Sequence, residues 1–166
     1  AELGVQSERR LARLLDKNLN NELPPFLTIG EIGLESGYMG AQYLPTSLVA
    51  ENKVLASPVS NESIPTNANN QDIVSMGTIA ARKTLKITNN VKYILAVELL
   101  CACQAVDIIK PQKLGKGTQT AYNVLRRKVP SLRESRRINL DIEKAADLIV
   151  NNSLVNEVES SIGKLD

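Results

Sequence analysis

Residues 72–109 read DIVSMGTIAARKTLKITNNVKYILAVELLCACQAVDII, and this stretch decides the fold. It contains no proline, and its single glycine, Gly77, lies near the start. Apolar residues recur along it at spacings of three and four, which is typical of one face of an α-helix. The stretch therefore predicts one helix of roughly 35 to 38 residues, beginning near Asp72, with a length of about 57 Å at the usual rise per residue.

A helix of that length is longer than the globule that 166 residues form on their own. A compact chain of this size would be only about 40 Å across. The portion 93–109 is also apolar on nearly all sides, which indicates a helix surrounded by other helices. We therefore expect an all-α fold, an elongated helical bundle that is completed by oligomerisation with helical partner chains.

The flanking segments also favour helices, and no strand pattern is present. Residues 2–16 have apolar residues at helical spacing, and the segment from about Gly37 to Ala56 does so with Pro45 as a kink or as part of the first turn. A further helix is expected before Pro130. The last segment, residues 141–162, predicts two helices that are separated near Asn151 and Asn152.

Residues 57–71 interrupt this helical pattern, because they are rich in Ser, Asn, Pro and Thr. They predict a polar loop, and loops of this length inside compact domains are usually functional or disordered. Asp72 follows the loop directly, where an acidic side chain suits the start of a helix. The whole chain, residues 1–166, is otherwise expected to form a single helical region.

Several classes of function are excluded by composition. The chain has no histidine, which excludes a Ser-His-Asp triad, a Cys-His pair and a zinc site containing histidine. We expect no metal site. Cys101 and Cys103 are two residues apart on a helix, so they point to different faces and are expected to be buried, reduced thiols. No apolar run reaches the ~20 residues that cross a bilayer, and the first residues lack a signal-peptide core, so we expect a cytoplasmic location and no membrane partner.

Charge is distributed unevenly along the chain, although the net charge is only +2. Residues 1–71 carry a net charge of −3 and residues 72–166 a net charge of +5. Basic side chains concentrate in residues 126–137, where Glu134 alone opposes them: Arg126, Arg127, Lys128, Arg133, Arg136 and Arg137. Such a segment can bind nucleic-acid phosphates. Because it lacks aromatic residues and contains Pro130, a solvated face or ion pairs between subunits is favoured, and nucleic-acid binding is the alternative.

Specific blocks of sequence carry a family resemblance. The run SIPTNANNQDIVSMGTIAARK, residues 63–83, resembles the corresponding run of the histidine and aromatic amino-acid ammonia-lyases. Five further blocks resemble that family in the same order and cover nearly the whole chain: SERR (7–10), LPPFLT (23–28), SGYMGAQ (36–42), SLVAENK (47–53) and LGKGT (114–118). The chain is thus similar to the carboxy-terminal part of such an enzyme, a carbon–nitrogen lyase that assembles as a tetramer of long helical bundles.

The resemblance implies a cofactor that this sequence does not encode. In the family, a methylidene-imidazolone electrophile forms from an internal Ala-Ser-Gly triplet, and this chain contains no such triplet. The nearest string, Glu35-Ser36-Gly37, matches a different family block and is no substitute. The family's catalytic residues lie in its amino-terminal part, so none is expected here. We expect the chain to contribute substrate-pocket wall and oligomer core and to be inactive alone.

Four residues are candidates for substrate binding: Met39, Gln71, Asn70 and Asn67. Met39 falls where histidine-type members carry Met, at the end of the substrate side chain. Gln71 falls where those members carry Glu, near the bound amino acid, whereas the string Asn-Gln-Asp-Ile is closer to phenylalanine- and tyrosine-type members. On chemistry alone, Met39 would be a core filler and the Asn-rich run a turn with a helix cap.

The resemblance therefore implies elimination of ammonia from an amino acid with a flat aromatic or imidazole side chain. The choice among histidine, tyrosine and phenylalanine stays open, as does the choice between lyase and aminomutase. The partners of this chain would be further copies of itself or a separate amino-terminal subunit. A non-catalytic helical oligomerisation protein is the other alternative. Whether the chain is a natural split subunit, a relic of the family or a fragment of a longer enzyme stays open.

Overall fold

The computed structural model describes residues 1–61 and 63–165, so that Glu62 and Asp166 lie outside the described residues. These residues form helices joined by loops, and the only β-type pairing among them consists of isolated bridges. The predicted all-α fold is confirmed. The helices are α1 (Glu2–Leu15), η1 (Pro25–Leu27), η2 (Met39–Gln42), α2 (Tyr43–Leu55), α3 (Gly77–Ile109), α4 (Lys116–Arg126), α5 (Ile138–Val150) and α6 (Ser153–Ile162), where η denotes a short 3-10 helix.

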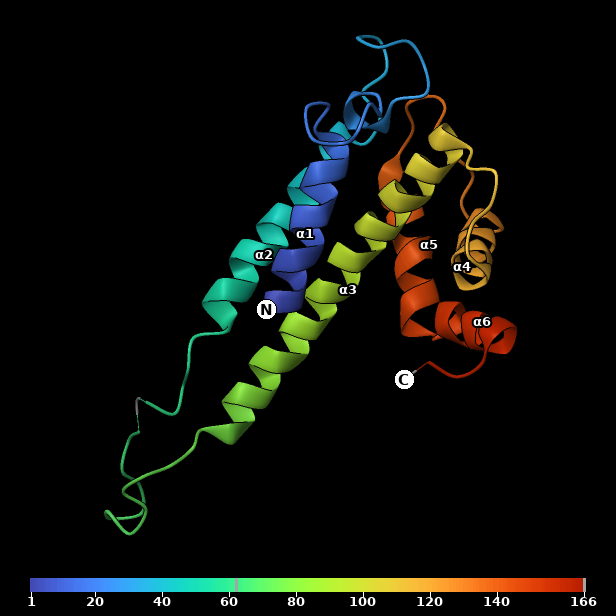
Figure 1. The fold of residues 1–166 in the computed structure, drawn as a ribbon. Coiled ribbons are helices and arrows are strands. Elements are labelled where there is room, and N and C mark those ends of the chain that lie inside the picture. The colour runs from blue at the N-terminus through green and yellow to red at the C-terminus, as the bar shows by residue number, and fades with distance from the viewer. Residues whose placement is uncertain (62, 166) are drawn as a thin grey trace.

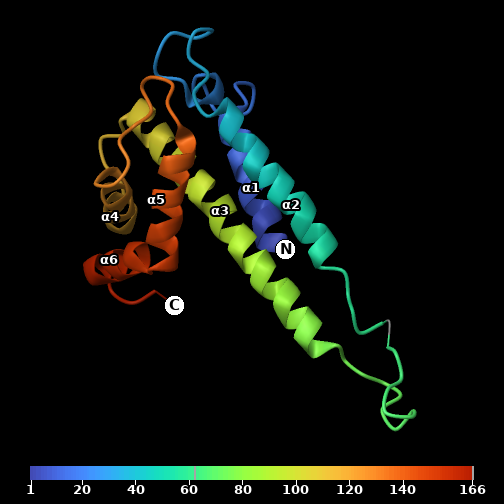
Figure 2. The ribbon, with the colours of Figure 1, turned by 180° about the vertical axis from the view of Figure 1, so that it is seen from behind.

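Helix α3 is the axis of an elongated molecule (Figure 1). Helices α1 and α2 lie side by side along it, and α5 packs on its carboxy-terminal half, as the view from behind also shows (Figure 2). Helices α4 and α6 pack mainly on each other, next to α5. The core lies where these layers meet α3, and includes the fully buried side chains of Leu11, Val97 and Leu125.

The predicted start of the longest helix near Asp72 is wrong. Helix α3 begins at Gly77 and has 33 residues, which corresponds to about 50 Å. The preceding backbone bonds to the polar loop instead: the Val74 amide donates to Ser63 Oγ at 2.8 Å, and Ser63 Oγ donates to the Asp72 carbonyl at 3.3 Å. The helix is preceded by Met76 in a left-handed conformation, so Asp72 does not cap it.

Burial along α3 changes from one half to the other. In the second half, Ile94, Leu100 and Cys101 are fully buried beneath the surrounding helices. In the first half, Leu85 is 72% exposed, and this half extends beyond the end of α1 (Figure 1). The overhang that the sequence predicts is therefore present, and its coverage by partner chains stays a prediction.

The shorter helices agree with the sequence pattern. Pro45 lies in the first turn of α2, which is one of the two positions predicted for it. The break between α5 and α6 falls at Asn151 and Asn152, as predicted, and Asn152 takes a left-handed φ of 53°. Residues 57–71, which the pattern assigned to a polar loop, carry no helix in their described part; Glu62 in this stretch is not described.

Candidate functional site

Met39 stands at the beginning of η2, with its side chain 44% exposed. The preceding residue, Tyr38, is fully buried, and its amide donates to the Phe26 carbonyl at 2.9 Å. Gly37 has a φ of +52°, and a Cβ at this position would lie 2.5 Å from the same carbonyl. Only glycine fits this close approach, which turns the chain so that Tyr38 points inward and Met39 outward.

The Tyr38 side chain is a buried anchor for this turn. Burial, with a smaller contribution from Cys101, raises its pKa well above the ordinary value. Its hydroxyl has no hydrogen-bond partner among residues 1–61 and 63–165. Tyr38 was not identified as important from the sequence, although its place directly before Met39 could have drawn attention to it.

The other three candidates share one tight turn in the loop between α2 and α3. The Thr66 amide donates to the Gln71 carbonyl at 2.9 Å, and the Gln71 amide donates back at 3.3 Å. Inside this bridge the Asn70 amide donates to the Asn67 carbonyl at 3.0 Å, and Asn67 has a left-handed φ of 54°. The backbone geometry is that of an Asn-rich turn, in which these residue types tolerate left-handed conformations.

The turn presents neutral amides to its surroundings. The side chains of Asn67, Asn70 and Gln71 are exposed, and Gln71 Oε1 lies 3.3 Å from the hydroxyl of Thr66, which donates to it. Asn70 and Gln71 also line an open surface hollow, together with Ile73. An amide both donates and accepts hydrogen bonds, so these groups can bind either the carboxylate or the ammonium group of an amino acid.

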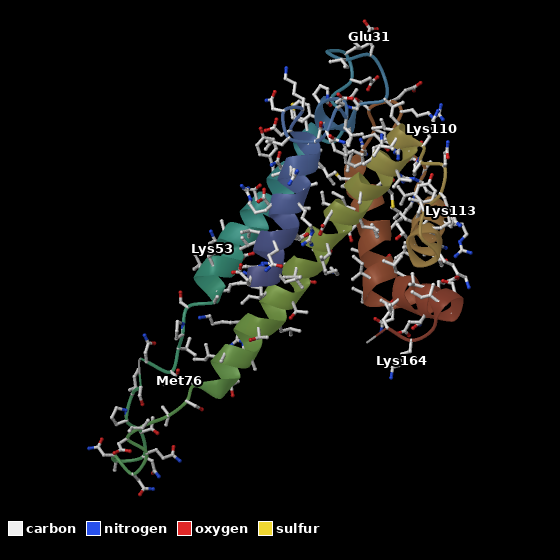
Figure 3. All side chains as sticks on the ribbon, in the orientation of Figure 1. Glu31, Lys53, Met76, Lys110, Lys113 and Lys164 are labelled. Carbon is white, nitrogen blue, oxygen red and sulfur yellow. The ribbon has the colours of Figure 1, made fainter. Side chains whose placement is uncertain are left out.

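Met39 and this turn lie at opposite ends of the molecule. Met39 begins η2, which directly precedes α2, and the turn comes after α2, whose 13 residues span about 20 Å. Figure 3 shows the same separation. Glu31 is at one end, in the connection between α1 and α2 (residues 16–42), which we call the Met39-bearing segment, and Met76, shortly after Gln71, is at the other end. The structure thus brings Asn67, Asn70 and Gln71 together and leaves Met39 apart from them.

The basic segment is partly neutralised within its own chain. Arg126 pairs with Asp107 at 2.6 Å, Arg136 with Asp141 at 2.8 Å and Arg127 with Glu157 at 3.1 Å. The other three basic side chains of the segment are exposed: Lys128, Arg133 and Arg137. Three of the six basic side chains therefore form ion pairs inside the chain, whereas the sequence analysis favoured a solvated face or ion pairs between subunits.

Metal and thiol chemistry find little support in the described part of the chain. Within residues 1–61 and 63–165, no three His, Cys, Asp or Glu side chains gather as a metal site would require. Cys101 and Cys103 are free and buried, and burial raises the pKa of Cys103 to about 11. None of the described helices is both long and apolar enough to cross a bilayer.

Comparison with known proteins gives a consistent result. The family model described as aromatic amino acid lyase matches residues 1–127. A histidine ammonia-lyase from Natranaerobius thermophilus is 53% identical over 165 residues, which are 99% of this chain and 32% of that relative. A tyrosine ammonia-lyase from Cupriavidus metallidurans is 45% identical over 96% of this chain and 30% of its own length.

Solved structures show the same relationship. The tyrosine aminomutase from Streptomyces globisporus superposes with a TM-score of 0.93 at 42% identity, covering 96% of this chain and 30% of the other. The histidine ammonia-lyase from Trypanosoma cruzi gives a TM-score of 0.91 at 39% identity, covering 97% and 31%. The chain spans about a third of the length of the curated relatives that it matches.

Proposed function

The chain belongs to the aromatic amino acid lyase family, and we propose that it supplies the carboxy-terminal part of a carbon–nitrogen lyase. The observation that carries the proposal is the match of the family model to residues 1–127, together with relatives that align over nearly the whole chain. In this proposal residues 1–166 form one helical region that contributes a wall of the substrate pocket and part of the oligomer core.

The proposed substrate is an α-amino acid with a flat aromatic or imidazole side chain. Met39 would contact the ring, because a half-exposed thioether is apolar and adapts its shape to a flat surface. Gln71, with Asn70 and Asn67, would hydrogen-bond the polar end of the amino acid. Relatives that act on histidine and on tyrosine, by their names, support this substrate class.

The proposed pocket requires more than one copy of the chain. The helix α2, about 20 Å long, separates Met39 from Gln71, and no single amino acid spans that distance. Both residues line one pocket only if each comes from a different copy. The exposed apolar residues of α3, such as Ile79 and Leu85, support association with partner helices.

The electrophile of the family would come from outside this sequence. The chain has no Ala-Ser-Gly triplet, so its residues do not fit as the source of methylidene-imidazolone, and no reaction step is assigned here through that group. The amino-terminal part that supplies it would be continuous with this chain or a separate subunit. A cytoplasmic location completes the proposal, since the free thiols of Cys101 and Cys103 suit a reducing compartment.

The test uses an enzyme in which this chain is assembled with an amino-terminal part that contains Ala-Ser-Gly. Gln71→Glu places a negative charge at the polar end of the substrate, and a charged hydrogen bond differs from a neutral one by enough to change rates about tenfold. We therefore expect the relative kcat/KM values for histidine, phenylalanine and tyrosine to change by about that factor.

The matched control is Asn69→Asp, which adds the same charge to the same turn at a residue outside the proposed pocket. It should leave the relative values within about twofold, as expected for a surface charge in water. Unchanged ratios in Gln71→Glu, or equal changes in both variants, would remove Gln71 from the pocket.

A further inference from the structure

We infer that Gln104, near the carboxy-terminal end of α3, is a positioning residue that sets where Met39 stands in the pocket wall. It would do so through a strained backbone turn at Phe26 and Leu27, which joins the buried amide to the Met39-bearing segment. The inference rests on the proposed function for its effect on substrate choice, and on geometry alone for its effect on the position of Met39.

Gln104 is the polar centre of an apolar stretch of α3. Its side chain is fully buried and makes three hydrogen bonds to backbone groups of two other segments. Nε2 donates to the carbonyl of Leu27 at 3.2 Å and to that of Leu132 at 2.8 Å, and Oε1 accepts from the Leu132 amide at 3.0 Å. One side chain therefore hydrogen-bonds three buried backbone groups that have no partner within a helix or a sheet.

The turn that Gln104 holds is strained. Phe26 has φ 55° and ψ 21°, and Leu27 has φ 57°, which are left-handed conformations that bulky residues rarely adopt. Each such residue raises the free energy of the fold, and it persists only where surrounding contacts fix it. For Leu27 those contacts are complete burial of the side chain and the hydrogen bond from Gln104.

The strained turn is connected directly to Met39. The carbonyl of Phe26 accepts the amide of Tyr38, and Gly37 packs against the same carbonyl. If the Phe26–Leu27 turn relaxed to an ordinary conformation, this carbonyl would rotate away and the support for Tyr38 would be lost. Met39 follows Tyr38 in the chain, so its side chain would move with it.

A second contact fixes the same two segments against each other. The Ser135 amide donates to Glu35 Oε2 at 2.6 Å, which joins the Met39-bearing segment to the connection between α4 and α5. Gly30 also packs close to the carbonyl of Arg133. Because this connection contains Leu132, Gln104 holds both sides of the contact, and its removal would loosen both together.

The two methionines of the chain provide a direct readout. Met39 directly follows Tyr38, whose amide belongs to this network, and Met76 lies at the other end of the molecule from Glu31 (Figure 3). The experiment records methyl signals of 13C-methionine in the assembled protein, with the Met39 signal identified by Met39→Leu. Gln104→Leu, which removes the hydrogen bonds without adding a third methionine, should shift or broaden the Met39 signal and leave the Met76 signal unchanged.

The matched control is Ile94→Ala, another fully buried position of α3, about 15 Å along the helix from Gln104. It should lower the thermal midpoint while leaving the Met39 signal in place. If Gln104→Leu does not fold, Gln104→Asn serves instead, because it keeps a neutral amide that is too short to reach all three partners, and it should produce a smaller shift. An unmoved Met39 signal in the folded Gln104 variant, or an equal change in Ile94→Ala, would overturn the inference.

Kinetics then separate this inference from the proposed function. In the assembled enzyme, Gln104→Leu should raise KM for the preferred amino acid about tenfold with a smaller change in kcat, and it should add little to the effect of Met39→Leu. A shifted Met39 signal with unchanged KM values would support the positioning role of Gln104 and contradict the placement of Met39 in the pocket.

Discussion

The guanidinium of Arg126 lies 2.6 Å from the carboxylate of Asp107, and the two side chains are only 12% and 14% exposed. The hydroxyl of Tyr122 donates to the other oxygen of Asp107 at 2.5 Å, and Arg126 also donates to the carbonyl of Val129. The first basic residue of the segment 126–137 is therefore a structural link between α3 and α4, and its charge is not available to a partner.

Replacing Asp107 should destabilise the fold more than replacing an exposed ion-pair partner. Asp107→Ala leaves a nearly buried guanidinium without its counter-charge, and we expect a loss of about 2 to 3 kcal/mol in the free energy of unfolding. Glu157→Ala breaks the exposed pair with Arg127 and should cost less than about 1 kcal/mol. Urea unfolding of both variants measures the difference, and equal losses would contradict it.

The segment 126–137 should not bind nucleic acid with a steep salt dependence. Three of its six basic side chains are paired inside the chain, so few remain to release counterions from phosphates. Fluorescence anisotropy with labelled single-stranded and duplex DNA, over a salt titration, should show no saturable binding. A large negative slope of log K against log salt that Arg133→Ala reduces would favour the nucleic-acid alternative.

The 166-residue chain by itself should form no unsaturated acid from histidine, phenylalanine or tyrosine. The α-amino group is a poor leaving group, and general acid–base catalysis contributes only about 10² to 10⁴-fold, which cannot replace an electrophilic cofactor. Ultraviolet absorbance of the products measures the reaction. Adding an amino-terminal part that contains Ala-Ser-Gly should restore turnover, and activity of the chain alone would refute this prediction.

Stability should fall as the pH rises above about 9, the ordinary pKa of a thiol. Burial raises the pKa of Cys103 to about 11 and raises the pKa of Cys101 as well, so the folded chain holds these protons more tightly than the unfolded chain. The resulting stabilisation is complete below pH 9 and is lost as the pH rises toward 11, by roughly 1 kcal/mol per pH unit for each thiol.

Urea unfolding across this pH range measures the slope, and Cys103→Ala is the matched variant. It should show a shallower decline because one titrating group is removed. Both thiols of the folded protein should also resist alkylation near neutral pH, since they are buried and protonated. A decline that Cys103→Ala does not reduce would assign the effect to other groups, such as Tyr38.

The helices could be predicted from sequence because their apolar residues repeat with the helical period. Residues 93–109 and the break at Asn151 and Asn152 show this most clearly, since packing in the structure follows the sequence pattern. The start of α3 could not be predicted in the same way. There, hydrogen bonds from Ser63 hold the backbone of residues 72 and 74, and such a contact across a loop leaves no periodic signal.

The candidate site, too, could be predicted from the sequence only in part. Neighbouring residues in the sequence, Asn67 to Gln71, fold into one local turn, as their composition indicates. Their distance from Met39 depends on the direction of α2, which the sequence pattern does not provide. Gln104 was missed, although an uncharged polar residue inside the apolar run LLCACQAV is a signal that a buried amide has partners elsewhere.

Because Met39 and Gln71 lie at opposite ends of the folded molecule, their separation would also affect how mutations in the gene are inherited. In the proposed assembly each pocket combines Met39 from one copy with Gln71 from another, so a defect in one gene product reaches pockets that it shares with normal products. Two alleles, one altered at Met39 and one at Gln71, would each give an impaired enzyme when expressed separately. A cell that expresses both would build some pockets in which both positions are intact, so the alleles would complement each other.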